Sequence, residues 1–268
     1  MTISCDIAGE GPAVVLLHAG VCDRRMWDAQ FSAIVAAGHR VLRCDFRGYG
    51  ETPVAEAPYT DTGDVLDLMD AHGVERAALV GASWGGRVAL LAAARAPHRV
   101  TGLALLDSVL PGLPGEDGKS PELAAFDEAE DAFFEAGDLD GATELNVRTW
   151  LGPEAGPEAR AAVRRMQRHA FAVQSAAEEA VERDGAAYVL DQDEEVWPPD
   201  LGGLREVPVL AVTGADDLPD FRGPAAALSA LLPRARHVEL PGTGHLPALE
   251  RPAETTALLT GFLAGLPA

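Results

Sequence analysis

The strongest chemical signal in the chain is the pentapeptide Gly81-Ala-Ser-Trp-Gly85. It directly follows an apolar run at 77–80 and directly precedes a segment at 87–95 whose composition is typical of a helix. A serine on such a sharp strand-to-helix turn exposes its hydroxyl, and the neighbouring glycines remove Cβ clashes. The helix that follows directs partial positive charge at that hydroxyl. The pattern predicts that Ser83 is a nucleophile, with a tight structural turn as the alternative.

A serine hydroxyl is a weak nucleophile and needs a general base. Of the seven histidines in the chain, His245 lies in Gly-Thr-Gly-His-Leu-Pro, a glycine-flanked loop that follows the last predicted strand. A loop at the carboxyl edge of a sheet can bring an imidazole to Ser83. We therefore predict that His245 is the base, with a backbone-capping loop histidine as the alternative.

The imidazole in turn needs a carboxylate that fixes its tautomer. Asp216 and Asp217 follow the apolar run at 207–213, and Asp107 follows the run before it. All three would stand at the carboxyl edge of a parallel sheet, so the residues alone leave the choice open. The carboxylates that do not contact the imidazole are expected to form turns and helix caps.

Acyl transfer also needs hydrogen-bond donors for the negative charge that develops on the carbonyl oxygen. The backbone amide of Trp84, directly after the nucleophile, is one predicted donor. The other is assigned to the amide of Gly20, in the loop His18-Ala-Gly-Val that follows the first long apolar run. His18 is expected to shape this loop rather than to act as a second base.

The elements that must position these residues are short apolar runs that alternate with amphipathic segments. Strands buried on both faces of a parallel sheet are predicted at 13–18, 40–44, 77–81, 101–106 and 207–213. Two further strands are predicted nearer the edges, at 235–240 and, antiparallel, at 2–7. Helices are predicted at 27–37, 62–72, 84–95, 222–232 and 252–264. The alternation predicts an α/β fold with a mostly parallel twisted sheet and helices on both faces.

This alternation breaks between residues 112 and 200, where amphipathic helical stripes follow one another without a strand pattern. We predict a core built from 1–111 and 201–268, with 112–200 as a helical cap inserted between two strands. Phe134, Trp150 and Trp197 in this insertion are predicted to line a substrate pocket; the alternative is that they form the core of the cap itself.

Several motifs together resemble the α/β-hydrolase superfamily, of the small capped serine type. They are His18-Ala-Gly (an oxyanion loop), Asp45-Phe-Arg-Gly-Tyr-Gly50 (a D-x-R-G-x-G turn), 81–85 (a nucleophile elbow), Gly214-Ala-Asp-Asp217 (an acid loop) and Gly244-His245 with Glu250 and Pro252 (a histidine loop). The resemblance covers nearly the whole chain except the insertion, and Ala19 departs from the usual glycine. It favours Asp217 as the acid and implies the chain order Ser, Asp, His.

Two side features accompany these motifs. Asp45 and Arg47 are expected to pair and to hold the turn beneath the oxyanion loop. Cys22 lies near that loop but has no local sign of thiolate activation, so it is expected to be a bystander. The three cysteines of the chain are odd in number and lack zinc-ligand spacing, which predicts free thiols in a reducing compartment.

The net charge of −21, from 21 basic and 42 acidic residues, disfavours nucleic acid and acidic membranes as partners. No signal peptide is visible and no apolar run reaches about 18 residues, which predicts a cytoplasmic protein. No phosphate-binding loop or cluster of metal ligands stands out, so neither a cofactor nor a metal is expected. A homodimer remains an open alternative.

These observations predict a cofactor-free serine hydrolase that acts on a small carboxylic ester or lactone through an acyl-enzyme on Ser83. The serine argues against haloalkane dehalogenase and epoxide hydrolase types, which resemble this chain but use aspartate at that position. Cofactor-free perhydrolysis of the haloperoxidase type and carbon–carbon bond hydrolysis are alternatives, because one fold hosts many chemistries. An alternative of another class is a ligand-binding or signalling protein that keeps these residues.

Overall fold

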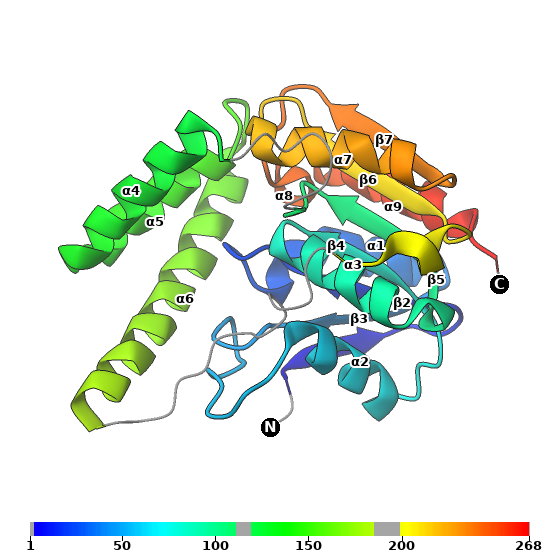
Figure 1. Cartoon of the computed structure of the whole chain (residues 1–268), viewed down its shortest axis with the longest axis horizontal. Helices are drawn as coiled ribbons and strands as arrows, with labels where there is room; N and C mark the ends of the chain where they lie inside the picture. Colours follow the sequence, from blue (N-terminus) through cyan, green and yellow to red (C-terminus); the bar gives the residue numbers. More distant parts are fainter. Residues whose placement is uncertain (1–2, 111–118, 185–198, 268) are drawn as a thin grey trace.

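The computed structural model describes residues 3–110, 119–184 and 199–267. Its centre is one seven-stranded sheet with the strand order β1-β3-β2-β4-β5-β6-β7 (Figure 1). The strands are β1 (Cys5–Ala8), β2 (Ala13–Leu17), β3 (Arg40–Cys44), β4 (Ala77–Ala82), β5 (Val100–Leu106), β6 (Val209–Gly214) and β7 (Ala235–Leu240). The edge strand β1 runs antiparallel to β3, and every other pair in this sheet is parallel. The predicted mostly parallel α/β sheet is confirmed.

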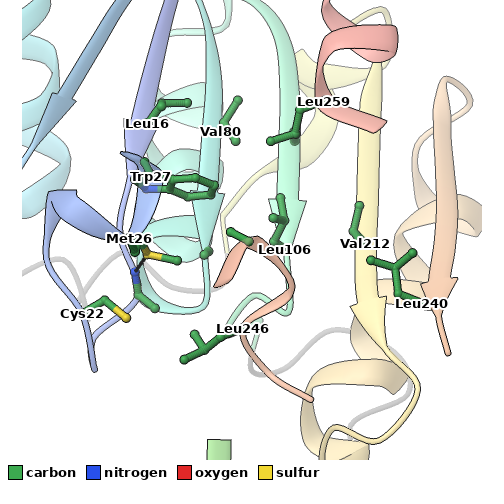
Figure 2. Close-up of a cluster of buried hydrophobic side chains, with 14 of the residues drawn as sticks. Leu16, Cys22, Met26, Trp27, Val80, Leu106, Val212, Leu240, Leu246 and Leu259 are labelled. Atoms are coloured by element: carbon green, nitrogen blue, oxygen red, sulfur yellow. Dashed lines mark hydrogen bonds between the residues drawn. The ribbon is translucent and has the colours of Figure 1, made fainter. Parts of the chain in front are cut away.

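Helices cover both faces of the sheet, and each face carries its own hydrophobic cluster. Along β2, alternate side chains belong to different clusters because successive residues of a strand point to opposite faces: Val14 joins one and Val15 the other. The first cluster includes Ile34 and also Leu259, which is labelled in Figure 2, and the second includes Val88. The core helices are α1 (Asp28–Ala36), α2 (Asp61–Ala71), α3 (Trp84–Arg95), α7 (Pro219–Leu231), α8 (Pro247–Glu250) and α9 (Pro252–Ala264).

The predicted strands and core helices are all present, with ends that differ by a few residues for physical reasons. The strand predicted from 207 begins at Val209, because the Val207 N–H donates to the carbonyl of Leu204 at 3.0 Å and Pro208 has no N–H. The helix predicted from 222 begins earlier, at Pro219, a residue type favoured in the first helical turn.

Between β5 and β6 the described residues 119–184 form three helices and no strand: α4 (Pro121–Glu135), α5 (Leu139–Trp150) and α6 (Pro157–Asp184). We call the segment 119–184 the helical insertion; its helices stand to one side of the sheet in Figure 1. Ser120 caps α4 by accepting the N–H of Leu123 at 3.1 Å. Apolar residues of the insertion join the first cluster of the core, among them Phe126, Val147, Trp150, Val163 and Met166. No helix within the described ranges is long and apolar enough to cross a membrane.

Candidate active site

Ser83 occupies a strained turn between β4 and α3, with φ 50° and ψ −116°. Such a conformation is costly for a residue other than glycine and persists where the surrounding structure enforces it. The enforcement is visible at two neighbouring glycines. A Cβ on Gly81 would lie 2.1 Å from the carbonyl oxygen of Gly85, and one on Gly85 would lie 2.4 Å from that of Leu17. The turn therefore requires both glycines.

Strand register places Asp107 on the strand next to Ser83. Ala82, the residue before Ser83, pairs with Leu106, the residue before Asp107. The N–H of Ser83 donates to the carbonyl of Leu106 at 2.8 Å, and the N–H of Asp107 donates to that of Val212 at 2.8 Å. Both side chains thus start from the carboxyl edge of the sheet.

His245 and Asp217 meet at this same edge as a buried hydrogen-bonded pair. Nδ1 of His245 lies 2.8 Å from Oδ2 of Asp217, and the two residues are 2% and 7% exposed. Because a carboxylate only accepts hydrogen bonds, Nδ1 donates in this contact, and in the neutral form of the ring Nε2 is then the acceptor. Asp216 is exposed, so of the two adjacent aspartates it is Asp217 that contacts the imidazole.

Asp107 is a second carboxyl group beside this pair. It is fully buried, and its Oδ1 accepts the N–H of Gly214 at 2.9 Å. Burial, followed by the neighbouring charge of Asp217, raises the pKa of Asp107 well above its ordinary value. Ligand-type atoms of Asp107, Asp217 and His245 all lie within 4.8 Å of one another, and these donor types can bind a metal ion. The hydrogen bond from Nδ1 of His245 to Oδ2 of Asp217 already uses one of these atoms from each residue. Hydrogen bonding therefore explains why the three side chains lie together.

Glu250 holds the backbone on both sides of His245. Its Oε2 accepts the N–H of Gly244 at 3.1 Å and that of Gly152 at 2.8 Å, while its Oε1 accepts the N–H of Leu246 at 3.1 Å. Burial raises the pKa of this carboxyl. Since Gly152 follows α5, Glu250 also ties the helical insertion to the histidine loop. The motif containing Glu250 was visible in the sequence, but these three contacts were not.

Aromatic rings enclose the imidazole of His245. Its ring centre lies 4.3 Å from that of Phe221 and 4.8 Å from that of Trp150. The backbone carbonyl of Trp150 accepts the backbone N–H of His245 at 2.9 Å. The indole N–H of Trp150 donates to the side-chain oxygen of Asn146 at 2.7 Å. The structure thus places Trp150, predicted to line a pocket, against the imidazole. Sequence reasoning missed Phe221 and Asn146, because both reach the site through long-range packing that leaves no local signal.

The other two residues predicted for the pocket lie elsewhere or outside the description. Phe134 is 37% exposed and packs edge-on against Phe171 of α6, with ring centres 4.9 Å apart. This contact joins two helices of the insertion, and Phe134 lies neither against the imidazole nor in a buried core. Trp197 falls outside the described residues.

The loop predicted to supply an oxyanion donor is held by His18. The N–H of Phe46 donates to its Nε2 at 2.9 Å, so Nδ1 carries the proton and donates to the carbonyl of Ala19 at 2.8 Å. Burial lowers the pKa of His18, which keeps the ring neutral. The carbonyl of His18 accepts the N–H of Gly85 at 3.1 Å and so joins this loop to the serine turn.

Gly20 lies beside Trp84, and a Cβ at Gly20 would fit without a clash. A Cβ built on Gly20 would meet the Cβ of Trp84 at 3.7 Å and the hydroxyl of Tyr49 at 3.9 Å, both ordinary contacts. Trp84 is the first residue of α3, where an amide has no acceptor within the helix. Its indole N–H donates to Asp61 at 2.8 Å, which fixes the side chain. Cys22 is fully buried, and burial raises the pKa of its thiol well above the ordinary value.

The expected pairing of Asp45 with Arg47 is wrong. Asp45 pairs with the side chain of Arg24 and also accepts the backbone N–H of Glu51 at 2.9 Å. Arg47 instead pairs with Asp64 of α2 at 2.6 Å. The cause is the fold of the turn, which reverses at a glycine with φ 51°, Gly50, and brings the chain back over Asp45. Asp45 and Arg47 are only two residues apart in the sequence, but their side chains point toward different partners.

Comparison with known proteins identifies the class. The sequence profile of the family described as the alpha/beta hydrolase fold matches residues 12–252, a segment that includes Ser83, Asp217 and His245. This match covers most of the chain, and the chain therefore belongs to that family.

Individual relatives within the family carry different names. Epoxide hydrolase A of Mycobacterium tuberculosis (strain ATCC 25618 / H37Rv) is 30% identical over 305 aligned positions, covering 97% of this chain and 93% of that protein. An epoxide hydrolase of Caballeronia sordidicola is 40% identical over 96 residues, or 34% of this chain and 29% of that protein. The chain thus spans less than a third of the length of the first curated relatives that it matches. The crystal structure of the enol-lactonase from Burkholderia xenovorans LB400 superposes with a TM-score of 0.73 at 27% identity, covering 98% of this chain and 96% of that one.

Proposed function

We propose that this chain is a serine hydrolase that acts on a small carboxylic ester or lactone. The observation that carries the proposal is the buried 2.8 Å hydrogen bond between His245 Nδ1 and Asp217, at the same sheet edge as a serine in a strained, glycine-enforced turn. A base oriented by a carboxylate, at the sheet edge that also carries the serine turn, is the arrangement that activates a serine for acyl transfer.

In the proposed reaction, Oγ of Ser83 attacks the carbonyl carbon of the substrate while Nε2 of His245 takes the hydroxyl proton. Asp217 stabilises the imidazolium that forms. The amides of Trp84 and Gly20 donate to the oxyanion. His245 then returns the proton to the leaving alkoxide. Water, deprotonated by the same imidazole, cleaves the acyl-enzyme and releases the acid.

The serine at position 83 favours acyl substrates over epoxides, even though the relative matched over most of its length is named an epoxide hydrolase. A serine that opened an epoxide would form an ether, which water does not readily cleave. A serine that attacks an ester or lactone forms an ester, which the same machinery can hydrolyse. The structural likeness to an enol-lactonase agrees with this choice of substrate.

The helical insertion is proposed to act as a cap that covers the sheet edge. Its residues Trp150 and Gly152 contact the histidine loop, through the ring of His245 and the carboxylate of Glu250. A cap in this position excludes water from the reacting groups and limits which acyl chains can enter.

A panel of p-nitrophenyl acetate, p-nitrophenyl butyrate and unsubstituted lactones tests the proposal, with lactone opening followed by acid release. We expect multiple turnover of at least one ester or lactone by the wild type and none above background by Ser83→Ala. Multiple turnover of an epoxide with no ester or lactone turnover would contradict it. Carbon–carbon cleavage, peracid formation or single-turnover binding in place of ester turnover would replace the proposed substrate class.

A further inference from the structure

Asp107 is a buried carboxyl group that the proposed mechanism does not use. Its side chain is fully buried, and its Oδ1 accepts the N–H of Gly214. Its Oδ2 is also buried and has no hydrogen-bond donor within the described part of the chain. An ionised oxygen in that position would lose its hydration without compensation, which is costly. We therefore expect Oδ2 to be protonated.

The ionisable groups around Asp107 point to the same conclusion. Asp217 and Glu250 act on it with negative charge, and His245 lies beyond Asp217. Ligand-type atoms of Asp107, Asp217 and His245 lie within 4.8 Å of one another. Two carboxyl groups this close in a buried site cannot both ionise easily, so one of them keeps a proton. Asp217 accepts from Nδ1 of His245 and must be the charged member, which leaves the proton on Asp107.

We propose that Asp107 is a positioning residue that, as a neutral carboxylic acid, donates a hydrogen bond from Oδ2 to Asp217 and so fixes the carboxylate that orients His245. The inference rests on the proposed function of Asp217 and His245. The raised pKa of Asp107 agrees with it. A carboxyl group that served only to cap Gly214 would not need this proximity to Asp217.

The proposal distinguishes two substitutions of similar size. In Asp107→Asn the amide NH₂ can still donate to Asp217 while the amide oxygen accepts the N–H of Gly214. In Asp107→Leu both interactions are lost. Asp216→Asn is the matched control, because Asp216 is exposed and adjacent in sequence to Asp217.

Kinetics of these three variants and of Asp217→Asn, on the best substrate of the ester and lactone panel, form the first arm of the test. Loss of the donor should lower kcat of Asp107→Leu by roughly ten- to hundredfold with KM nearly unchanged, since a buried acceptor is left unsatisfied. Asp107→Asn should stay within about threefold of the wild type because its hydrogen bonds survive. Unchanged kcat in a folded Asp107→Leu, or an Asp107→Asn as damaged as Asp217→Asn, would overturn the proposal.

Infrared difference spectroscopy in H₂O and D₂O forms the second arm and needs neither turnover nor the leucine variant. At neutral pH we expect a carboxylic-acid C=O band that Asp107→Asn removes and Asp216→Asn retains. Any band from Glu250, whose pKa burial also raises, should persist in both variants. If Asp107→Asn removes no such band, Asp107 is ionised and the inference is wrong. A wild type that shows the band but hydrolyses no ester would instead count against the proposed function.

Discussion

His18 and His245 are both buried histidines near the serine turn, but their ring nitrogens have different partners. Both nitrogens of His18 bond to backbone, to the N–H of Phe46 and to the carbonyl of Ala19. Only Nδ1 of His245 is bonded, to Asp217, and no residue in the described ranges bonds to its Nε2. The comparison teaches that burial alone does not mark a base. What distinguishes His245, the proposed base, is a carboxylate on one nitrogen and no protein partner among the described residues on the other.

Replacing each histidine by alanine should separate the two roles most strongly. His245→Ala should lower turnover by roughly 10⁴–10⁶, as loss of a triad base does elsewhere. His18→Ala should instead lower the free energy of unfolding by about 1–3 kcal/mol, because the buried N–H of Phe46 loses its acceptor. Urea unfolding and kcat, measured on both variants, test this. Equal loss of turnover in two equally stable variants would remove the distinction.

Substitution of Asp217, the carboxylate that contacts the imidazole of His245, should have the next largest effect on kcat. Asp217→Asn should lower kcat by about 10⁴, because an amide can hold the ring of His245 in the wrong tautomer. Asp216→Asn, one residue earlier and exposed, should have nearly wild-type kinetics. Steady-state kinetics of the pair decide between them. If Asp216→Asn were the inactive variant, the acid would have to be reassigned despite the observed contact with Asp217.

The stability of the fold should depend on pH through His18. Burial lowers the pKa of His18, so the folded protein keeps this ring neutral. In the unfolded chain the same ring has the ordinary histidine pKa of about 6.5. Stability from this residue is therefore complete above that value and is lost as pH falls toward the lower folded pKa. Urea midpoints between about pH 5 and 8 should show the decline in wild type and a flatter profile in His18→Ala. Identical slopes would mean that His18 titrates normally.

The sequence predicted the sheet edge well because its signals are local. Continuous apolar runs fix the strands of a parallel sheet, and the Gly81–Gly85 turn depends on steric contacts between residues four apart and with β2. The loop with His245 was also visible, because glycines mark it in the chain.

Features that depend on distant packing could not be predicted. Nothing near Asp45 in the sequence shows that Arg24, rather than Arg47, is its partner. The aromatic enclosure of His245 joins Trp150 of the insertion to Phe221 of α7, which are far apart in the chain. Contacts of this kind are set by how elements dock, and side-chain spacing along one element does not encode them.

The helical insertion should give the smallest effects on chemistry. Trp150→Phe should change the ranking of acyl chain lengths by tens- to hundredfold at most, the usual range for one apolar contact in a pocket. Phe134→Leu should change it less, since Phe134 contacts Phe171 rather than the imidazole. Comparing kcat/KM across a series of p-nitrophenyl esters measures both. Complete loss of activity in a folded Trp150→Phe would show that the insertion supports the chemistry itself.

Labelling with a small fluorophosphonate tests the central claim most directly, because the probe reacts with an activated serine irrespective of the natural substrate. Peptide mass spectrometry should find a single adduct on Ser83, absent in Ser83→Ala and strongly slowed in His245→Ala. The adduct should persist in Ser108→Ala. Ser108 is the matched control because it is also buried and lies against the start of α3, where its Oγ would be 1.8 Å from a Cβ built on Gly86. An adduct on another serine, or no adduct on folded wild-type protein, would contradict the account.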